Sequence, residues 1–120
     1  MGTNRMTLRA TTFLIALAFS AVALAGPTGN AANGKKKAVA VCAACHGADG
    51  NKTLDASYPK LGGQYPEYLA KSLHEYKSGK RKNAIMAGQA QALDEQDIAD
   101  LSAYYAAQTS QIHDLSSHTR

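Results

Sequence analysis

The stretch Val41-Cys42-Ala43-Ala44-Cys45-His46-Gly47 contains the only two cysteines of the 120-residue chain. They lie three positions apart, and a histidine directly follows the second. Thiols and imidazoles bind metals, exchange disulfides and form covalent links to cofactors. The pattern is therefore compatible with a redox dithiol, part of a zinc site, a short disulfide or a point of haem attachment. The rest of the sequence is needed to discriminate among these four interpretations.

The first 25 residues have the layout of a removable export signal. Arg5 and Arg9 precede an apolar run that starts at Phe13, and the run ends in the small residues of Ala23-Leu24-Ala25. This run is too short for an ordinary membrane span, although an uncleaved N-terminal anchor is the alternative. We therefore expect residues 1–25 to be a signal peptide, cleaved after about Ala25, that directs the chain to the periplasm.

The charge balance argues against a nucleic-acid partner. The whole chain has 13 Lys and Arg against 9 Asp and Glu. The predicted signal peptide contains two of the cations and none of the anions, which leaves 11 against 9 in the remainder. That remainder has no dense basic stripe of the kind that binds a phosphate backbone. Once the signal is cleaved, we also expect no membrane-spanning segment.

Helix signals without any strand-like alternation predict an all-α domain at residues 34–110, between a flexible leader at 26–33 and a mobile tail at 111–120. The Ala- and Lys-rich segment 35–45 predicts a helix that ends at the cysteine motif. Pro66 suits the first position of a second helix, which Gly79 would end. Residues 80–92 are expected to form a loop with room for one short helical turn. Asp94 is a good N-cap for a third helix that continues to about residue 108.

Apolar residues at helical spacing predict which faces of these helices are buried. In the second helix the stripe consists of Tyr65, Leu69, Leu73 and Tyr76. In the third it consists of Ile98, Leu101 and Tyr105, with Tyr104 beside it. Leu93 and Ile98 flank the Asp94 cap in the positions of a hydrophobic staple.

The surroundings of the cysteine motif favour haem attachment over the alternatives. A thioredoxin-like dithiol needs a βαβ context, which is not predicted here. Structural zinc needs four ligands, and the other histidines, His74, His113 and His118, have no paired spacing. A disulfide across two residues would close too short a loop to add much stability. On one helical turn, by contrast, Cys42 and Cys45 share a face and can each bond one vinyl carbon of a porphyrin, with His46 placed as the proximal iron ligand.

Met86 is the candidate for the opposite side of the iron. A six-coordinate electron-transfer haem needs a second axial ligand, usually Met or His. Met86 is the only methionine beyond the predicted signal peptide, and it lies 40 residues after His46 in the irregular segment 83–88. A methionine can also simply fill a gap in the core, and His74 is a rival ligand. We favour Met86 as the ligand because its segment is predicted to be a loop between helices.

Taken together, these features resemble the class I c-type cytochromes. The resemblance rests on CAACHG, on Tyr58-Pro59-Lys60-Leu61-Gly62-Gly63-Gln64, on the late methionine, and on a final helix with Leu101 and Tyr104. Over about residues 34–108 the chain is similar to small bacterial monohaem members and to single halves of dihaem ones. The resemblance implies three to four short helices wrapped around one covalently attached haem c.

The same resemblance implies further roles for individual residues. Gly34 is expected where the first and last helices cross, against Leu101 and Tyr104. The backbone carbonyl of Pro59 is expected to accept the second ring N–H of His46, which orients the imidazole. Where the family often has an aromatic residue, four positions before the first cysteine, this chain has Ala38. We therefore expect the contact between the first and last helices to be smaller where they cross, or to be shifted by one residue.

The resemblance also implies electron transfer rather than catalysis. We expect a monomeric one-electron carrier between partners such as a membrane quinol-oxidising cytochrome complex and a terminal oxidase or reductase. The alternative is a haem subunit of a larger dehydrogenase or reductase complex. A five-coordinate haem that binds gases or reduces peroxide would need an open coordination position on the iron. The availability of Met86 as a ligand argues against this.

A cluster of cations precedes Met86, namely Lys77, Lys80, Arg81 and Lys82. These residues could steer an acidic partner or pair with haem propionates, or they could be an ordinary solvated run. Arg81 is the better propionate candidate because its planar guanidinium matches a carboxylate.

Overall fold

The computed structural model describes residue 2 and residues 26–112. Apart from residue 2, the predicted signal peptide lies outside the described residues, as do His113, His118 and most of the predicted tail. Within the described residues, the chain forms five α-helices and one π-helical turn, with no strand. None of these helices is long and apolar enough to cross a membrane.

The N-terminal helical segment ends at the cysteine motif, as predicted, but begins earlier. It consists of α1 (Ala31–Lys37), a π-helical turn (Ala38–Cys42) and α2 (Ala43–His46), which follow one another without a break. The side-chain oxygen of Asn30 accepts the backbone N–H groups of Ala32 and Asn33 at 3.0 and 3.1 Å and so caps α1. Residues 31–33, which we had assigned to the flexible leader, therefore belong to α1.

Helices α3 (Pro66–Lys77) and α5 (Glu95–Ala106) agree with the predicted start signals. Pro66 occupies the first turn of α3, and Gly79 just beyond the helix has a positive φ of 75°. Asp94 caps α5 and forms a reciprocal capping box with Asp97. In the predicted stripe Leu69 is buried and Leu73 and Tyr76 are partly buried, whereas Tyr65 stands before α3 and is 76% exposed.

Residues 84–91 are the main difference from the predicted secondary structure. They form the helix α4 (Ala84–Gln91), where we expected a loop with one short turn. The side chain of Asn83 caps this helix by accepting the N–H of Met86 at 3.0 Å. The helix has almost no apolar stripe, so periodicity could not indicate it, whereas the Asn83 cap could have done so.

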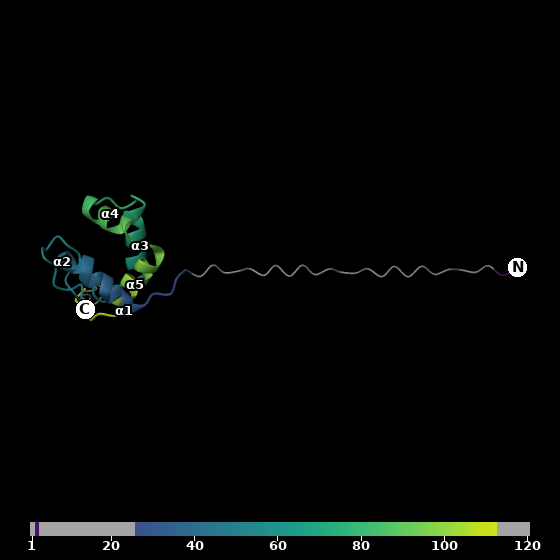
Figure 1. Cartoon of the computed structure of the whole chain (residues 1–120), viewed down its shortest axis with the longest axis horizontal. Helices are drawn as coiled ribbons and strands as arrows, with labels where there is room; N and C mark the ends of the chain where they lie inside the picture. The colour runs from purple at the N-terminus through teal and green to yellow at the C-terminus, as the bar shows by residue number, and fades with distance from the viewer. Residues whose placement is uncertain (1, 3–25, 113–120) are drawn as a thin grey trace, which may run out of the picture.

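Helix α5 contacts both α1 and α3 and lies between them in Figure 1. Its predicted buried stripe is confirmed, because Ile98, Leu101, Tyr104 and Tyr105 are all buried. They form one apolar cluster with Ala38, Leu69 and Leu93. Ala38 is fully buried, so this small residue occupies the position where the family often has an aromatic side chain.

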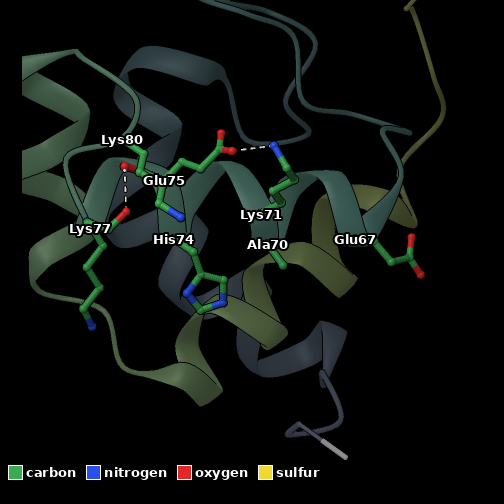
Figure 2. Close-up of a pocket in the computed structure, with 8 residues that line it drawn as sticks. Glu67, Ala70, Lys71, His74, Glu75, Lys77 and Lys80 are labelled. Carbon is green, nitrogen blue, oxygen red and sulfur yellow. Dashed lines mark hydrogen bonds and ion pairs between the residues drawn. The ribbon is translucent and has the colours of Figure 1, made fainter.

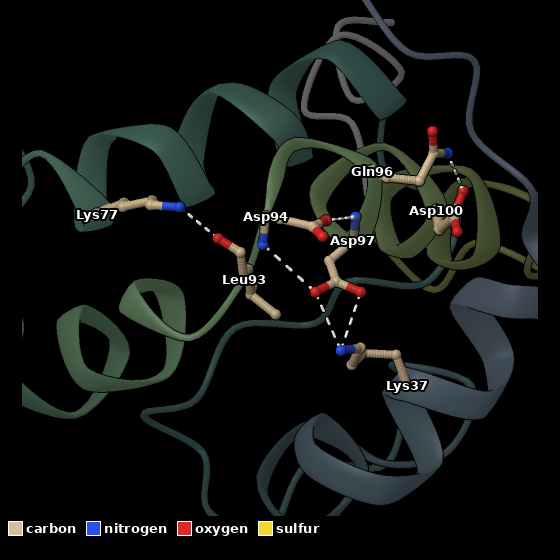
Figure 3. A network of polar contacts seen from close by, with 7 residues as sticks. All are labelled: Lys37, Lys77, Leu93, Asp94, Gln96, Asp97 and Asp100. Carbon is tan, nitrogen blue, oxygen red and sulfur yellow. Dashed lines mark hydrogen bonds and ion pairs between the residues drawn. The ribbon is translucent and has the colours of Figure 1, made fainter.

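Polar contacts at the start of α5 connect it to two other helices (Figure 3). The Lys37 ammonium on α1 lies 2.9 Å from the Asp97 carboxylate. The Lys77 ammonium at the end of α3 donates to the backbone carbonyl of Leu93. The N-terminus of α5 is thus held from both sides, which fixes the face that α5 presents to the cavity described next.

Candidate functional site

A single cavity of about 310 Å³ brings together all six residues singled out from the sequence. The cysteine motif contributes Cys42, Cys45 and His46 to its wall, and the segment that follows contributes Pro59. Arg81 and Met86 line it from the segment between α3 and α4 and from α4 itself. Residues 40 positions apart in the sequence therefore face the same space.

His46 is held in a defined orientation. It is buried, and its ring Nδ1 lies 2.9 Å from the backbone carbonyl oxygen of Pro59. Because a carbonyl can only accept, this contact places a ring proton on Nδ1, and in the neutral imidazole the lone pair then lies on Nε2. A neutral imidazole with Nε2 available is the form that binds a metal.

The turn after the motif brings Pro59 to His46. Gly47 has a φ of 83°, and a Cβ there would lie 2.6 Å from the Lys52 carbonyl oxygen, so glycine is required for this turn. The loop is then attached to the end of α5. The Tyr104 hydroxyl donates to the Ala48 carbonyl at 2.7 Å, and the Asn51 side-chain amide donates to the Thr109 carbonyl at 2.9 Å.

The two cysteines are free thiols that both reach the cavity. Burial raises the pKa of the Cys42 thiol, and contacts with Tyr105 and Lys37 act in the opposite direction. No disulfide joins Cys42 to Cys45. Across the described residues, no three His, Cys, Asp or Glu side chains gather as a zinc site requires, so the zinc interpretation gains no support.

Met86 lies in the first turn of α4 rather than in a loop, and its side chain is half-buried in the cavity wall. The Asn83 cap binds the backbone N–H of Met86 itself, so the contact that starts the helix also positions the Met86 backbone. The position of Met86 therefore depends on the Asn83 cap at the start of α4.

Arg81 sits at the edge of the cavity among side chains of α3. Its guanidinium donates to Ser72 Oγ and to the Tyr68 hydroxyl, each at 3.2 Å, and its Nε lies 3.5 Å from the Glu75 carboxylate. It also lies over the ring of Tyr76, 5.4 Å from the centroid. This packing fixes a positive charge at the cavity edge.

The rival ligand His74 does not line this cavity. Its Nε2 lies 3.5 Å from the Glu95 carboxylate, and its side chain is 46% exposed. Figure 2 shows it in a separate open groove along α3, which Glu67, Lys71, Lys77 and Lys80 also line. The predicted cation cluster is therefore divided, since Arg81 reaches the cavity while Lys77 and Lys80 face the groove.

Sequence reasoning missed several polar residues in the cavity wall. Among them are Tyr68 and Ser72 on α3 and Ser102 on α5. Tyr68 and Ser72 stand four positions apart on one helix face. Ser102 directly follows Leu101, and it stands three positions before Tyr105 in the buried stripe. A helical wheel places all three near the apolar faces of their helices, and this was the sequence signal that could have found them.

The chemistry of the cavity fits a covalently attached haem. The wall is largely apolar and aromatic, with Val41, Leu61, Leu69, Leu73, Ile85 and Leu101 among its residues. It offers two thiols, one oriented imidazole and one thioether, which are the groups that attach and ligate haem c. A fixed guanidinium at the edge suits the carboxylates of the porphyrin.

Comparison with known proteins agrees with this donor set. The cytochrome c family matches residues 31–107. The chain belongs to the cytochrome c family. This confirms the predicted resemblance to class I c-type cytochromes and the all-α fold. A cytochrome c domain binds haem c covalently, and members of the family transfer electrons rather than catalyse reactions.

The most informative relatives differ in length. Cytochrome c4 of Pseudomonas aeruginosa is 51% identical over 85 residues, which are 71% of this chain and 41% of that protein. Cytochrome c-554(548) of Halomonas halodenitrificans is 46% identical over 83 residues, which are 67% of this chain and 98% of that protein. The structure of reduced recombinant cytochrome c4 from Pseudomonas stutzeri superimposes with a TM-score of 0.63 at 40% identity, covering 68% of this chain and 47% of that one. The chain thus spans less than half of these two cytochromes c4 and nearly all of the shorter relative.

Proposed function

We propose that this cytochrome c is a periplasmic monohaem carrier that transfers one electron at a time between respiratory partner proteins. The observation that carries the proposal is the single cavity, which His46 lines from α2 and Met86 lines from α4, with two free thiols beside the histidine. The single Cys-x-x-Cys-His motif supports one haem.

Cys42 and Cys45 are proposed as the covalent anchors. Each thiol would add across one vinyl group, so that a carbon–sulfur bond forms and the thiol proton moves to the adjacent vinyl carbon. The addition needs no oxidant or reductant. Both cysteines occupy one helical turn next to His46, so attachment would also fix the ring against the imidazole.

His46 Nε2 and the Met86 sulfur are proposed as the two axial ligands. The Pro59 carbonyl would hold the His46 ring and increase its basicity. A thioether is a weak donor to ferric iron, so Met86 would favour the ferrous state relative to a second histidine. The haem supplies the one-electron chemistry, and two ligands on separate helices would keep its geometry nearly constant between oxidation states.

The rest of the cavity would set the electrostatics. Its apolar wall excludes water and favours the less charged ferrous site. Arg81 is proposed to hold a haem propionate at the cavity edge, where Tyr68 and Ser72 fix its guanidinium. A membrane quinol-oxidising cytochrome complex and a terminal oxidase or reductase are proposed as electron donor and acceptor.

Spectroscopy of the protein expressed with the haem-attachment machinery tests the proposal. The pyridine haemochrome should show one haem c per chain, and the spectra should be low-spin in both oxidation states. Met86→Ala should give a high-spin ferrous form that binds carbon monoxide, with a lower potential. His74→Ala is the matched control, because it removes the rival ligand and should leave the spectrum unchanged.

Two outcomes would contradict the ligand assignment. One is a Met86→Ala protein with the spectrum and potential of the parent, and the other is a loss of the low-spin form in His74→Ala. A carrier should also purify at its monomer mass. Copurification of a catalytic chain would favour the alternative, a haem subunit of a larger dehydrogenase or reductase complex.

A further inference from the structure

Two buried hydroxyls on α5 have no hydrogen-bond partner among the described residues. Ser102 Oγ and the Tyr105 hydroxyl are both unpaired, and each residue is 3% exposed. Both residues line the cavity. Because they stand three positions apart, they share one face of the helix. Leaving a buried hydroxyl without a partner is unfavourable, because its hydrogen bonds to water are lost, so this face is expected to gain a partner when the cavity is filled.

The two hydroxyls differ in what they can reach. A serine inside a helix can turn its hydroxyl toward the carbonyl four residues back, which for Ser102 belongs to Ile98. The Tyr105 hydroxyl stands at the end of a rigid ring, and that ring packs in the core against Tyr104, with centroids 5.1 Å apart. Tyr105 therefore needs a partner from outside α5.

Cys42 is the neighbouring group that can become this partner. It lines the same cavity and packs against the apolar cluster that contains Tyr105. Burial raises the pKa of the Tyr105 hydroxyl, so the hydroxyl keeps its proton and acts as a donor. A free thiol and a thioether sulfur are both weak acceptors, but the thiol also carries a proton that it can donate, whereas the thioether sulfur can only accept.

We propose that Tyr105 donates a hydrogen bond to the Cys42 sulfur once that sulfur is bonded to haem, and that this bond favours the ferrous state. The inference rests on the proposed attachment of haem at Cys42. The positive end of the hydroxyl dipole at the sulfur draws electron density from the porphyrin edge, and burial strengthens this effect. Tyr105 is thus a positioning residue, which acts on the haem through Cys42.

The neighbouring tyrosines provide a matched pair of variants. Tyr105→Phe removes the hydroxyl near Cys42, whereas Tyr104→Phe removes one that already donates to the Ala48 carbonyl at 2.7 Å. Tyr105→Phe should lower the reduction potential of the haem-loaded protein. Tyr104→Phe should lower the denaturation midpoint and leave the potential unchanged.

A double-mutant cycle with Cys42→Ala, in which haem is attached through Cys45 alone, isolates the sulfur. In this background Tyr105→Phe should no longer shift the potential, while Tyr104→Phe should still destabilise the protein. Resonance Raman spectra of the parent background give a second readout. The carbon–sulfur stretching band should shift in Tyr105→Phe and stay in place in Tyr104→Phe.

The outcomes separate this inference from the proposed function. A parent without covalent haem in the pyridine haemochrome would overturn both. If the parent binds haem but Tyr105→Phe changes neither its reduction potential nor its carbon–sulfur band, the Tyr105 inference alone is overturned. An equal potential shift in the parent and Cys42→Ala backgrounds would also overturn it, because the effect would then not pass through the sulfur.

Discussion

Gly34 of α1 and Asp100 of α5 meet backbone to backbone. A Cβ added at Gly34 would lie 2.0 Å from the Asp100 carbonyl oxygen and 2.8 Å from the Tyr104 Cβ. Neither contact can be relieved by rotating a flexible side chain. The crossing of α1 over α5, and with it the placement of the cysteine motif against the core, therefore requires glycine at this position.

Gly34→Ala should destabilise the protein strongly. Overpacking usually costs about 1–3 kcal/mol, and a contact with rigid backbone places this change at or above the upper end of that range. Urea denaturation of the haem-loaded protein measures the loss. Gly88→Ala on α4 is the control, because nothing lies within 4 Å of its Cβ position, and it should gain about 0.5–1 kcal/mol from helix propensity. Equal stability of Gly34→Ala and the parent would show that the crossing can open without cost.

The Lys37–Asp97 pair makes stability depend on pH. Asp97 accepts from the Lys37 ammonium and from the Asp94 backbone N–H, and these contacts lower the pKa of Asp97, with the Lys37 bond as the largest cause (Figure 3). The unfolded value is about 3.9. The stabilisation is therefore present above about pH 4 and is lost as pH falls through the lower folded value.

Asp97→Asn should accordingly cost most near neutral pH. The difference in unfolding free energy between the parent and this variant should shrink as pH falls below about 4. Lys37→Ala should reproduce much of the loss, whereas Lys36→Ala, on the exposed side of α1, should not. Denaturation of the parent and the variants at a series of pH values measures these differences. If the difference in unfolding free energy between the parent and Asp97→Asn stayed constant from neutral to acid pH, the Lys37–Asp97 pair would not be the source of the pH dependence.

Features decided by neighbouring residues could be predicted from the sequence. The Asp94 capping box, Pro66 in the first turn of α3 and the buried stripe of α5 all follow from local chemistry. Cys42, Cys45 and His46 came from one short motif, whereas Met86 was chosen as the only methionine beyond the predicted signal peptide. All of these residues line one cavity.

Features that depend on distant contacts, or that leave no apolar pattern in the sequence, were missed or misplaced. The start of α1 depends on Asn30, whose own N–H donates to Asp100 of α5 at 2.6 Å, a contact across 70 positions. Helix α4 lacks an apolar stripe, so its cap was the only local sign of it. The π-helical turn before Cys42 leaves no mark in the apolar pattern. The network that holds Arg81 joins α3 to the next segment and cannot be read from spacing alone.

Pro59→Ala should keep the bond to His46, since the acceptor is the backbone carbonyl rather than the ring. The expected cost is about 0.4–1 kcal/mol, because a less restricted residue raises the entropy of the unfolded chain. Denaturation should show this modest loss, while the low-spin spectrum should persist. If the low-spin spectrum disappeared, the proline ring itself would be needed to place the carbonyl.

Asn83 should control how firmly Met86 binds iron. Asn83→Ala removes the cap that binds the Met86 N–H and should cost about 1 kcal/mol at the start of α4. If that cost falls on the ligated state, the fraction of molecules with Met86 detached should rise about fivefold. Carbon monoxide binding to the ferrous protein measures this fraction, because the gas needs an open position. Asn83→Ser retains a side-chain acceptor, so the fraction of its molecules that bind carbon monoxide should be nearly the same as in the parent. Equal binding by the parent and Asn83→Ala would mean that contacts of the Met86 side chain, rather than the cap of its helix, keep the sulfur in place.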